Sequence, residues 1–228
     1  MKMNPEILKN IPLFSELGEK DLDKIIQVAS KQKYHKDNLI LLEEEVGSTM
    51  FIILNGRVKI SRISDDGREV ILSILSDGDF FGEMSLLDGH TRSANVTAIE
   101  ESELLVIRRE EFLQMLRDFP QIAINLLKEL AQRIRKSDEH IKSLSLQDAT
   151  GRVATTLLRI AEDSGVFRKG QVEIAELPLQ QDLANMAGTS RETISRVIKS
   201  LCDDGFLKKT TGKIIILDYE NFRMRFSK

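Results

Sequence analysis

Short apolar runs separated by closely spaced glycine turns constrain the first half of this chain most strongly. Asn-Gly at 55–56, Asp-Gly at 66–67 and Asp-Gly at 77–78 divide residues 33–110 into segments rich in β-branched side chains. Turns of this kind, recurring at intervals of about 8–12 residues, are typical of antiparallel sandwiches and rolls. We therefore expect an antiparallel, jelly-roll-like β-roll, in which Asp66-Gly67 closes the clearest hairpin.

Helical patterns flank this region on both sides. Residues 4–30 predict short helices, and a longer helical stretch runs from about Phe112 to Leu146 with a break near Pro120. Along the second stretch, apolar residues are spaced alternately by three and four positions, with one polar member: Leu127, Leu130, Ile134, Ser137, Ile141 and Leu144. This seam favours a coiled coil between two copies, and an amphipathic helix lying on its own domain is the alternative.

The last third of the chain changes pattern again. After Gly151 come the helix RVATTLLRIAED, a hairpin near Lys169-Gly170 and the helix QQDLANMA. A tight connection at Gly188-Thr189 leads to a second helix that extends from Ser190 to about Asp203, and a hairpin follows at Thr211-Gly212. Helix, short glycine turn and helix form the helix-turn-helix arrangement, and the final strands supply a wing.

The second helix of this pair has two distinct faces. Ile194, Val197, Ile198 and Leu201 form the apolar face, and Thr189-x-x-Glu192 fits a capping box, with Ser190 as the alternative cap. Arginine binds guanine edges bidentately and glutamate accepts from cytosine, whereas a solvated helix face with charge pairs is the alternative interpretation. The candidate contacts to double-stranded DNA are Thr189, Ser190, Arg191, Glu192, Ser195, Arg196 and Lys199.

Charge is distributed unevenly along the chain. The net charge is -3. Residues 147–228 carry 13 Lys and Arg against 11 Asp and Glu, while the remainder carries 20 against 25. An acidic front and a mildly basic back indicate two different tasks.

Several classes of protein are disfavoured by what the sequence lacks. The single Cys202 allows no disulfide within the chain and fits a reducing compartment. No apolar stretch is long enough for a membrane span, and the N-terminus lacks the apolar core of a signal peptide, so we expect a cytoplasmic protein. The chain contains no P-loop, nucleophile elbow or HExxH motif, and we expect no enzyme.

Two segments of the chain resemble motifs of a known protein family. The segments "FGEMSLLDGHTRSA" (81–94) and "SRETISRVIKSL" (190–201) resemble the phosphate-binding cassette and the recognition helix of the cyclic-AMP receptor protein/fumarate-nitrate regulator (CRP/FNR) family of bacterial transcription factors. The resemblance covers nearly the whole chain. It implies an α+β fold with a sensory β-roll at 1–116, a dimerisation helix at 117–146 and a winged helix-turn-helix domain at 147–228.

The resemblance also implies roles in an effector pocket. Glu83 would accept from a ribose 2′-hydroxyl, and Arg92 would pair with a cyclic phosphate through its planar fork of donors. Ser93 and the backbone around Gly82, Glu83 and Met84 would complete the cradle. Because adjacent residues of a regular strand point to opposite faces, Arg92 and Ser93 can both face one ligand only in an irregular segment, or if Ser93 contributes its backbone.

The dimer helix carries the next part of the implied pocket. Ser137 aligns with a hydroxyl residue that contacts adenine in cyclic-AMP-responsive members, and Asp138 stands where those members place a second hydroxyl. This departure leaves open cyclic AMP, another cyclic nucleotide, another effector or control without a nucleotide. Iron–sulfur members need several cysteines, and the spacing of the three histidines suits no metal or haem, so we expect none of these cofactors.

The recognition motif implies a DNA target and partners. Arg191, Glu192 and Arg196 resemble the pattern that reads TGTGA-type half-sites, so we expect a palindrome related to TGTGA/TCACA bound by a homodimer that acts on RNA polymerase. A cyclic-nucleotide sensor that regulates a protein partner is the competing class. Such a sensor would share the roll and would not need a capped, charged helix before a wing.

Overall fold

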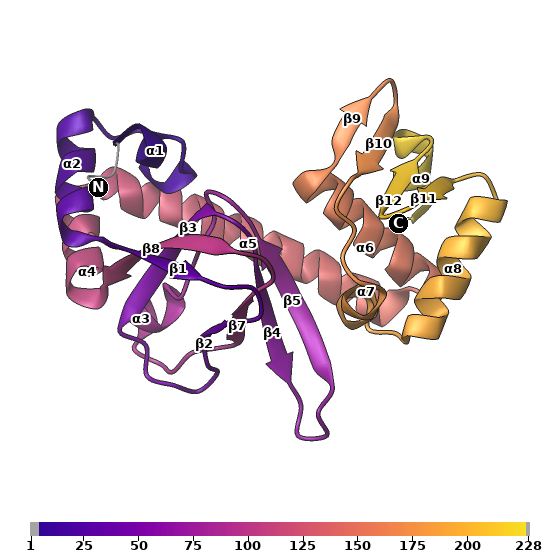
Figure 1. The fold of residues 1–228 in the computed structure, drawn as a ribbon, viewed down its shortest axis with the longest axis horizontal. Coiled ribbons are helices and arrows are strands. Elements are labelled where there is room, and N and C mark those ends of the chain that lie inside the picture. Colours follow the sequence, from indigo (N-terminus) through magenta and orange to yellow (C-terminus); the bar gives the residue numbers. More distant parts are fainter. Residues whose placement is uncertain (1–4, 227–228) are drawn as a thin grey trace. The chain divides into compact units, whose positions relative to one another are not determined.

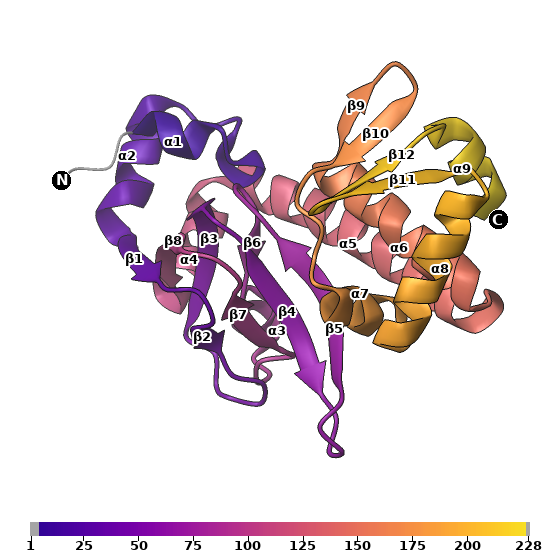
Figure 2. The same cartoon turned by 45° about the vertical axis from the view of Figure 1, so that its right-hand side comes forward.

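A computed structural model describes residues 5–226, and these divide into two compact units between Ile134 and Arg135 (Figures 1 and 2). The outermost residues of the first and last predicted segments, 1–4 and 227–228, lie outside the described residues. The predicted α+β class, with antiparallel sheets, a long helix and a C-terminal helix-turn-helix, is confirmed. The boundaries at 116 and 146 stay predictions.

The first unit is built from two antiparallel four-stranded sheets. One has the order β1-β8-β3-β6 and the other the order β2-β7-β4-β5. Their bounds are β1 Ser30–Tyr34, β2 Leu39–Leu41, β3 Thr49–Asn55, β4 Val58–Ile63, β5 Glu69–Leu75, β6 Phe80–Phe81, β7 Asn95–Ala98 and β8 Ser102–Arg108.

The three glycine turns have two different roles in these sheets. Asp66-Gly67 joins β4 to β5, which pair from Val58↔Leu75 to Ile63↔Glu69, so the predicted hairpin is confirmed. Asn55-Gly56 and Asp77-Gly78 instead carry the chain from one sheet to the other, because β3 and β6 belong to a different sheet from β4 and β5. These two turns close the roll rather than a hairpin.

Strand β3 shows why its sequence is apolar without interruption. Met50 and Ile52 pack in a cluster with the flanking helices, and Phe51 and Ile53 pack in a second cluster with the other sheet. Successive side chains of a strand point to opposite faces, so both faces of β3 are buried. The helices of this unit are α1 Pro5–Lys9, the 3₁₀ turn η1 Pro12–Phe14, α2 Glu19–Val28, α3 Met84–Asp88, α4 Arg109–Asp118 and the first part of α5 Pro120–Leu146.

The second unit is a helix-turn-helix with four short strands. Its sheet has the order β11-β12-β10-β9, and Tyr219 and Phe222 of the last helix are buried. The elements after α5 are α6 Ala149–Ser164, β9 Val166–Arg168, β10 Gln171–Ile174, α7 Gln180–Ala187, α8 Arg191–Asp203, β11 Leu207–Thr210, β12 Lys213–Ile216 and α9 Tyr219–Phe226. Both predicted hairpins are present, as β9–β10 and β11–β12.

Helices α3 and α9 were not predicted from the sequence. Helix α3 spans five residues, which is too short for an apolar period to show, and it ends at Gly89 with a left-handed φ of 76°. Helix α9 buries only Tyr219 and Phe222 among its eight residues. In neither segment does the spacing of apolar residues favour a helix over a loop.

The predicted coiled-coil seam lies on α5 as exposed apolar surface. The exposed fractions of Leu127, Ile134 and Ile141 are 65%, 62% and 61%, and Leu144 is 43% exposed. Leu130, by contrast, packs in part against the core of the first unit. Across the described residues, no helix combines the length and apolar character that a membrane span needs.

Candidate functional site

The anion-binding candidate Arg92 is held rigidly in the first unit. It lies in an irregular segment between Thr91, which bridges to Val46, and β7. Its backbone N–H donates to the carbonyl of Glu45 (2.8 Å), and its carbonyl accepts from the N–H of Glu44 (2.9 Å). The residue is only 6% exposed. Its backbone is therefore held by main-chain contacts to the segment that contains Glu44 and Glu45.

The guanidinium of Arg92 donates to neutral oxygens. Nη1 donates to the carbonyl of Gly82 (2.7 Å) and to the hydroxyl of Ser85 (2.9 Å), and Nη2 donates to the carbonyl of Thr49 (2.7 Å). Among the described residues, no carboxylate forms an ion pair with Arg92 within 4.0 Å. Arg92 is thus a buried cation whose hydrogen-bond partners carry no charge.

Two glycines make room for this side chain. A Cβ on Gly82 would lie 2.9 Å from Nη1 of Arg92, and one on Gly47 would lie 2.1 Å from the Ser85 hydroxyl oxygen and 2.9 Å from the Arg92 Cζ. Gly82 also has a φ of 81°, which other residues rarely adopt. Gly82 was predicted to contribute its backbone to the cradle. Gly47 was missed, because it follows a run of glutamates that lacks any recognisable motif.

Glu83 is the second buried charge of this region. It is 2% exposed, and its Oε1 accepts from Nη1 of Arg133 at 3.1 Å. Burial raises the pKa of Glu83, while the charges of Arg133 and Arg92 oppose that rise. Burial likewise lowers the pKa of Arg92, and Glu83 and Glu45 act in the opposite direction. The two buried charges therefore support each other's ionised form.

Arg133 comes from helix α5 and was not predicted. Besides Glu83, it donates through Nη2 to the carbonyl of Phe80 at 2.6 Å, and its guanidinium lies 4.4 Å from the centre of the Phe80 ring. The local sequence RIRKSDEH surrounds it with other charges. Nothing in that run distinguishes a partly buried arginine from a solvated one, so sequence reasoning had no signal for Arg133.

Ser93 and Met84 occupy a different environment from Arg92. Both are exposed, and the Ser93 hydroxyl lies 3.9 Å from the Met84 sulfur, which it faces as a weak donor. The segment around Arg92 and Ser93 is irregular, as the implied roles require. Their side chains nevertheless differ in burial, so a contribution of Ser93 to the cradle stays a prediction.

Ser137 and Asp138 lie beyond the division between the two units. Both are exposed on α5 and belong to the second unit. The unit that holds Arg92 and Glu83 contains neither of them. Their predicted contact with the base of a nucleotide therefore stays a prediction.

The second candidate site is the helix-turn-helix. Gly188 ends α7 with a left-handed φ of 58°, and the carbonyl of Ala187 accepts from Nε of Arg152 at 3.0 Å. Ser190 caps α8, since its hydroxyl oxygen accepts from the N–H of Thr193 at 3.2 Å. Thr189 instead donates its N–H to the carbonyl of Ala184. The predicted Thr189–Glu192 capping box was wrong by one residue, and the alternative cap is the correct one.

The charged face of α8 is exposed as predicted. Its exposed members are Arg191, Glu192, Ser195, Arg196 and Lys199, opposite the buried Ile194, Val197, Ile198 and Leu201. Hydrogen bonds from its own backbone and from Ser190 lower the pKa of Glu192, so this carboxylate is ionised at neutral pH. The Ser195 hydroxyl donates to Oε1 of Gln180, the first residue of α7, at 3.1 Å.

No metal centre accompanies these sites. Across residues 5–226, no group of three or more His, Cys, Asp and Glu side chains could hold a metal ion. Cys202 on α8 is half-buried and has a free thiol. The two candidate sites are therefore a buried arginine with neutral partners in the first unit and an exposed, charged helix in the second.

Comparisons with known proteins agree with this division. The cyclic nucleotide-binding domain family matches residues 31–119, and the Crp-like helix-turn-helix domain family matches residues 151–225. The chain is 34% identical over 207 residues to the cyclic AMP receptor protein of Thermus thermophilus, which covers 91% of this chain and 93% of that protein. It is also 34% identical to the cAMP-activated global transcriptional regulator Vfr of Pseudomonas aeruginosa, with 87% and 94% covered.

Solved structures show the same fold. The structure of a CooA mutant from Carboxydothermus hydrogenoformans superposes with a TM-score of 0.78 at 22% identity, and the match covers 90% of each chain. The relatives are regulators of transcription rather than enzymes. This chain, with its cyclic nucleotide-binding domain and its DNA-binding helix-turn-helix, belongs to the CRP/FNR family of transcription regulators.

Proposed function

We propose that a cyclic nucleotide controls the binding of this protein, as a homodimer, to a palindromic DNA site. The observation that carries the proposal is Arg92, a buried cation whose direct partners are all neutral oxygens. Burial lowers the pKa of Arg92 even though the charges of Glu83 and Glu45 oppose this, and an anion in direct contact would offset the cost of burial. A cyclic phosphate supplies the anion and matches the planar fork of the guanidinium.

The guanidinium of Arg92 keeps a donor for a phosphate oxygen. Its hydrogen bonds to Gly82, Ser85 and Thr49 use the two terminal nitrogens, so a phosphate would accept from Nε–H or share a donor of Nη2. Glu83, with its carboxylate held by Arg133, would accept from the ribose hydroxyl. Gly82, Met84 and Ser93 complete the proposed cradle, and the relatives named for cyclic AMP favour that nucleotide.

The proposed dimer interface is the apolar seam of α5. Leu127, Ile134 and Ile141 are spaced by seven residues and each is more than half exposed. Large apolar side chains repeating at this interval in one helix are stabilised by packing against a second helix. In the proposed dimer, Ser137 and Asp138 contact the base of the nucleotide. The effector thereby favours one arrangement of the paired helices.

The proposed DNA contacts are made by the two α8 helices of the dimer. Helix-turn-helix dimers, members of this family among them, place such helices in successive major grooves about 34–36 Å apart. Arg191, Glu192 and Arg196 would read a core related to TGTGA/TCACA, while Thr189, Ser190, Ser195 and Lys199 add contacts to phosphates or bases. We place this activity in the bacterial cytoplasm, with RNA polymerase as the partner.

Calorimetric titration of the full chain tests the effector. Cyclic AMP, cyclic GMP and cyclic di-GMP are titrated separately, and binding to a TGTGA/TCACA duplex is measured in parallel. We expect one cyclic nucleotide to bind and to tighten DNA binding, and Arg92→Ala to abolish both effects. Arg68→Ala, which alters an exposed arginine of the β4–β5 hairpin, is the matched control. Specific DNA binding that ignores all three nucleotides would support control without them and would overturn the proposal.

Sedimentation of the same chain tests the dimer. Ile134→Asp places a charge in the centre of the seam and should yield a monomer that loses specific DNA binding. Lys142→Asp, an exposed change on the same helix away from the seam, should leave the dimer intact. A wild-type chain that sediments as a monomer with and without nucleotide would remove the dimer from the proposal.

A further inference from the structure

Arg152, in the first turn of α6, joins three carbonyl groups of the second unit. Its Nε donates to the carbonyl of Ala187 at 3.0 Å and its Nη2 to that of Gly188 at 3.3 Å. Its Nη1 donates to the carbonyl of Gln147 at 3.2 Å. Within residues 5–226, no carboxylate forms an ion pair with Arg152 within 4.0 Å. The guanidinium is therefore engaged by backbone oxygens alone.

These carbonyls lie at the ends of two different helices. Ala187 is the last residue of α7 and Gly188 is its C-cap, while Gln147 directly follows Leu146, the last residue of α5. The final carbonyls of a helix have no partner within it and carry the negative end of its dipole. A cation that donates to both ends stabilises both. Arg152 thus connects the end of α5 with the end of α7.

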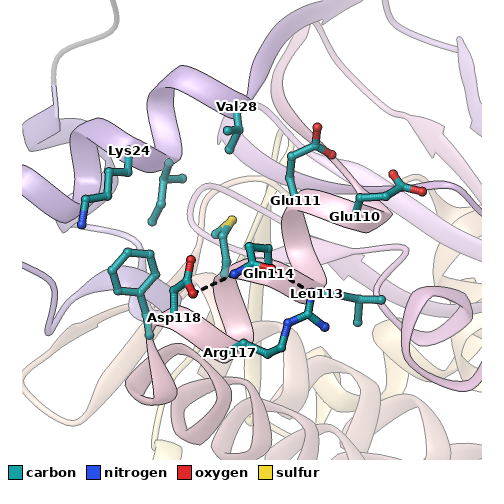
Figure 3. A pocket seen from close by; sticks show the side chains of 11 residues that line it. Lys24, Val28, Glu110, Glu111, Leu113, Gln114, Arg117 and Asp118 are labelled. Carbon is teal, nitrogen blue, oxygen red and sulfur yellow. Dashed lines mark hydrogen bonds between the residues drawn. The ribbon is translucent and has the colours of Figure 1, made fainter.

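Figure 3 shows an arginine with the opposite arrangement. Arg117 lines a pocket between α2 and α4 and donates to Gln114, three residues earlier in its own helix. A contact of that kind acts within one helix. Arg152 instead donates to residues 35 and 36 positions later in the chain, so its hydrogen bonds fix one segment relative to another.

The residue at the end of α5 is itself held by three elements. The side chain of Gln147 accepts from the hydroxyls of Ser143 on α5 (2.7 Å) and Thr155 on α6 (2.9 Å). It donates through Nε2 to the carbonyl of Phe226 on α9 at 2.9 Å. Arg152 therefore bonds to a backbone that has little freedom to move.

A second contact joins the same two places. A Cβ on Gly188 would lie 2.9 Å from Cδ2 of Leu144 in the last turn of α5, so the turn after α7 approaches α5 closely. Helix α8 begins at Arg191, three residues after Gly188, and Ser190 caps it. The recognition helix thus starts directly after a turn that is held against the end of α5.

We propose that Arg152 is a positioning residue for DNA recognition, which holds the turn before α8 to the end of α5 so that α8 takes its orientation from α5. Base edges are read only by side chains at hydrogen-bonding distance, whereas contacts to phosphates tolerate a looser fit. Arg152 therefore acts on specific binding. The inference rests on the proposed reading of bases by α8, and it requires neither a particular nucleotide nor a particular half-site.

The variant Arg152→Lys tests this role, because lysine keeps the charge but replaces the planar fork with a single ammonium group. A cognate duplex is first selected from random sequences by the wild-type chain, under the nucleotide condition that gives the tightest DNA binding. The affinity of Arg152→Lys for this duplex should fall about tenfold, as expected for the loss of charge-assisted hydrogen bonds. Its affinity for a random duplex should be unchanged.

The spacing of the selected site tests the link to α5. One base pair added at the centre of a palindrome should weaken binding of the wild-type dimer strongly, and should weaken binding of Arg152→Lys less, because its α8 is no longer held to α5. An equal penalty in both chains would contradict the link. A wild type without any penalty would contradict the proposed dimer, and the affinities for the cognate and random duplexes would still decide the role of Arg152.

The control variant separates positioning from stability. Ile174→Val removes one buried methylene group from the sheet of the same unit and should bind both duplexes like the wild type, and thermal unfolding compares its stability with that of Arg152→Lys. Equal weakening of cognate and random binding by Arg152→Lys would assign Arg152 to stabilisation of the fold. Undiminished cognate binding by Arg152→Lys would overturn the proposal. If Arg152→Gln then loses affinity for both duplexes and about one unit of salt slope, Arg152 contacts a phosphate directly.

Discussion

The two polar sites of this molecule are constructed in opposite ways. Arg92 and Glu83 are almost completely buried, and each is fixed by hydrogen bonds within the first unit. The charged residues of α8 are exposed on a helix that is held by its buried face, by the Ser190 cap and by the bond from Ser195 to Gln180. The pocket of Arg92 and Glu83 is thus part of the buried interior of the first unit. The charged face of α8 lies outside the core of the second unit.

This difference has an energetic consequence. Removing a partner from a buried pair leaves the other charge desolvated, so changes in the pocket reduce the stability of the fold as well as ligand binding. Removing an exposed side chain that has few partners usually changes stability by less than about 0.5 kcal/mol. Substitutions in α8 should therefore affect DNA binding with the fold unchanged.

The strongest test of the buried site is Arg133→Ala. It leaves the buried Glu83 carboxylate without its ion pair and should lower the free energy of unfolding by about 1–3 kcal/mol, less than for a fully buried pair because the Arg133 side chain is 30% exposed. Arg133 opposes the rise in the pKa of Glu83, so its removal raises that pKa further. The deficit should be largest at neutral pH and should shrink as falling pH protonates Glu83. Denaturant unfolding at several pH values measures it.

Glu83→Gln in the Arg133→Ala background is the matched rescue. With no buried carboxylate left, part of the lost stability should return, and the rest stays lost because Arg92 no longer has the charge of Glu83 beside it. A double variant as unstable as Arg133→Ala would contradict the charge argument. The contacts of Arg133 with Phe80 would then account for the whole effect.

The exposed site predicts the reverse behaviour. Arg191→Ala or Glu192→Ala should weaken binding to the cognate duplex by roughly 1–3 kcal/mol and relax the preference at one base position. The unfolding curve of Arg191→Ala should overlay that of the wild type, and that of Glu192→Ala should lie slightly below it, because this variant loses the hydrogen bonds that Glu192 accepts in the first turn of α8. Binding to a panel of half-site variants measures the preference, with Arg68→Ala as the control. A preference unchanged across the panel would remove both residues from base reading.

The sequence predicted the exposed site more completely than the buried one. The faces of α8 were predicted correctly, because an amphipathic helix shows its burial in a period of 3.6 residues. Residues 81–94 indicated Arg92 through a motif. Ser85 lies within the motif, and nothing in the motif identified it as a partner of Arg92. Arg133 and Gly47 were invisible, because they meet Glu83 and Arg92 only through tertiary packing of segments far apart in the chain. The sheet switching at 55–56 and 77–78 was hidden for the same reason.

The second unit also contains one polar pair that is shielded from solvent, so its polar side chains are not all exposed. Nδ1 of His140 on α5 contacts Nη1 of Arg159 on α6, and Glu139 and Asp163 act on Arg159. Burial and the charge of Arg159 lower the pKa of His140 to about 4. This contact requires a neutral imidazole.

Acid should therefore destabilise the second unit through His140. The pKa of His140 is lower in the folded state than in the unfolded state. The neutral imidazole therefore makes its full contribution to stability above the ordinary pKa near 6.5, and this contribution is lost as pH falls toward 4. One proton limits the slope to about 1.4 kcal/mol per pH unit. His140→Gln keeps an acceptor and should remove this component, as judged by unfolding between pH 7 and 4. Identical slopes for the two chains would contradict it.

The smallest expected effect lies at the junction of the two helices of the DNA-binding motif. Because Ser195 donates its proton to Gln180, its oxygen faces outward as an acceptor, which suits the amino groups of adenine or cytosine in the major groove. Gln180→Met frees the hydroxyl to donate and should shift the preference at one base by less than about 1 kcal/mol. Gln180→Glu keeps an acceptor and should keep the preference, although its charge weakens binding to all sequences equally. If Gln180→Met leaves the ranking of half-sites unchanged, Ser195 contacts a phosphate, and the exposed site reads bases through its charged residues alone.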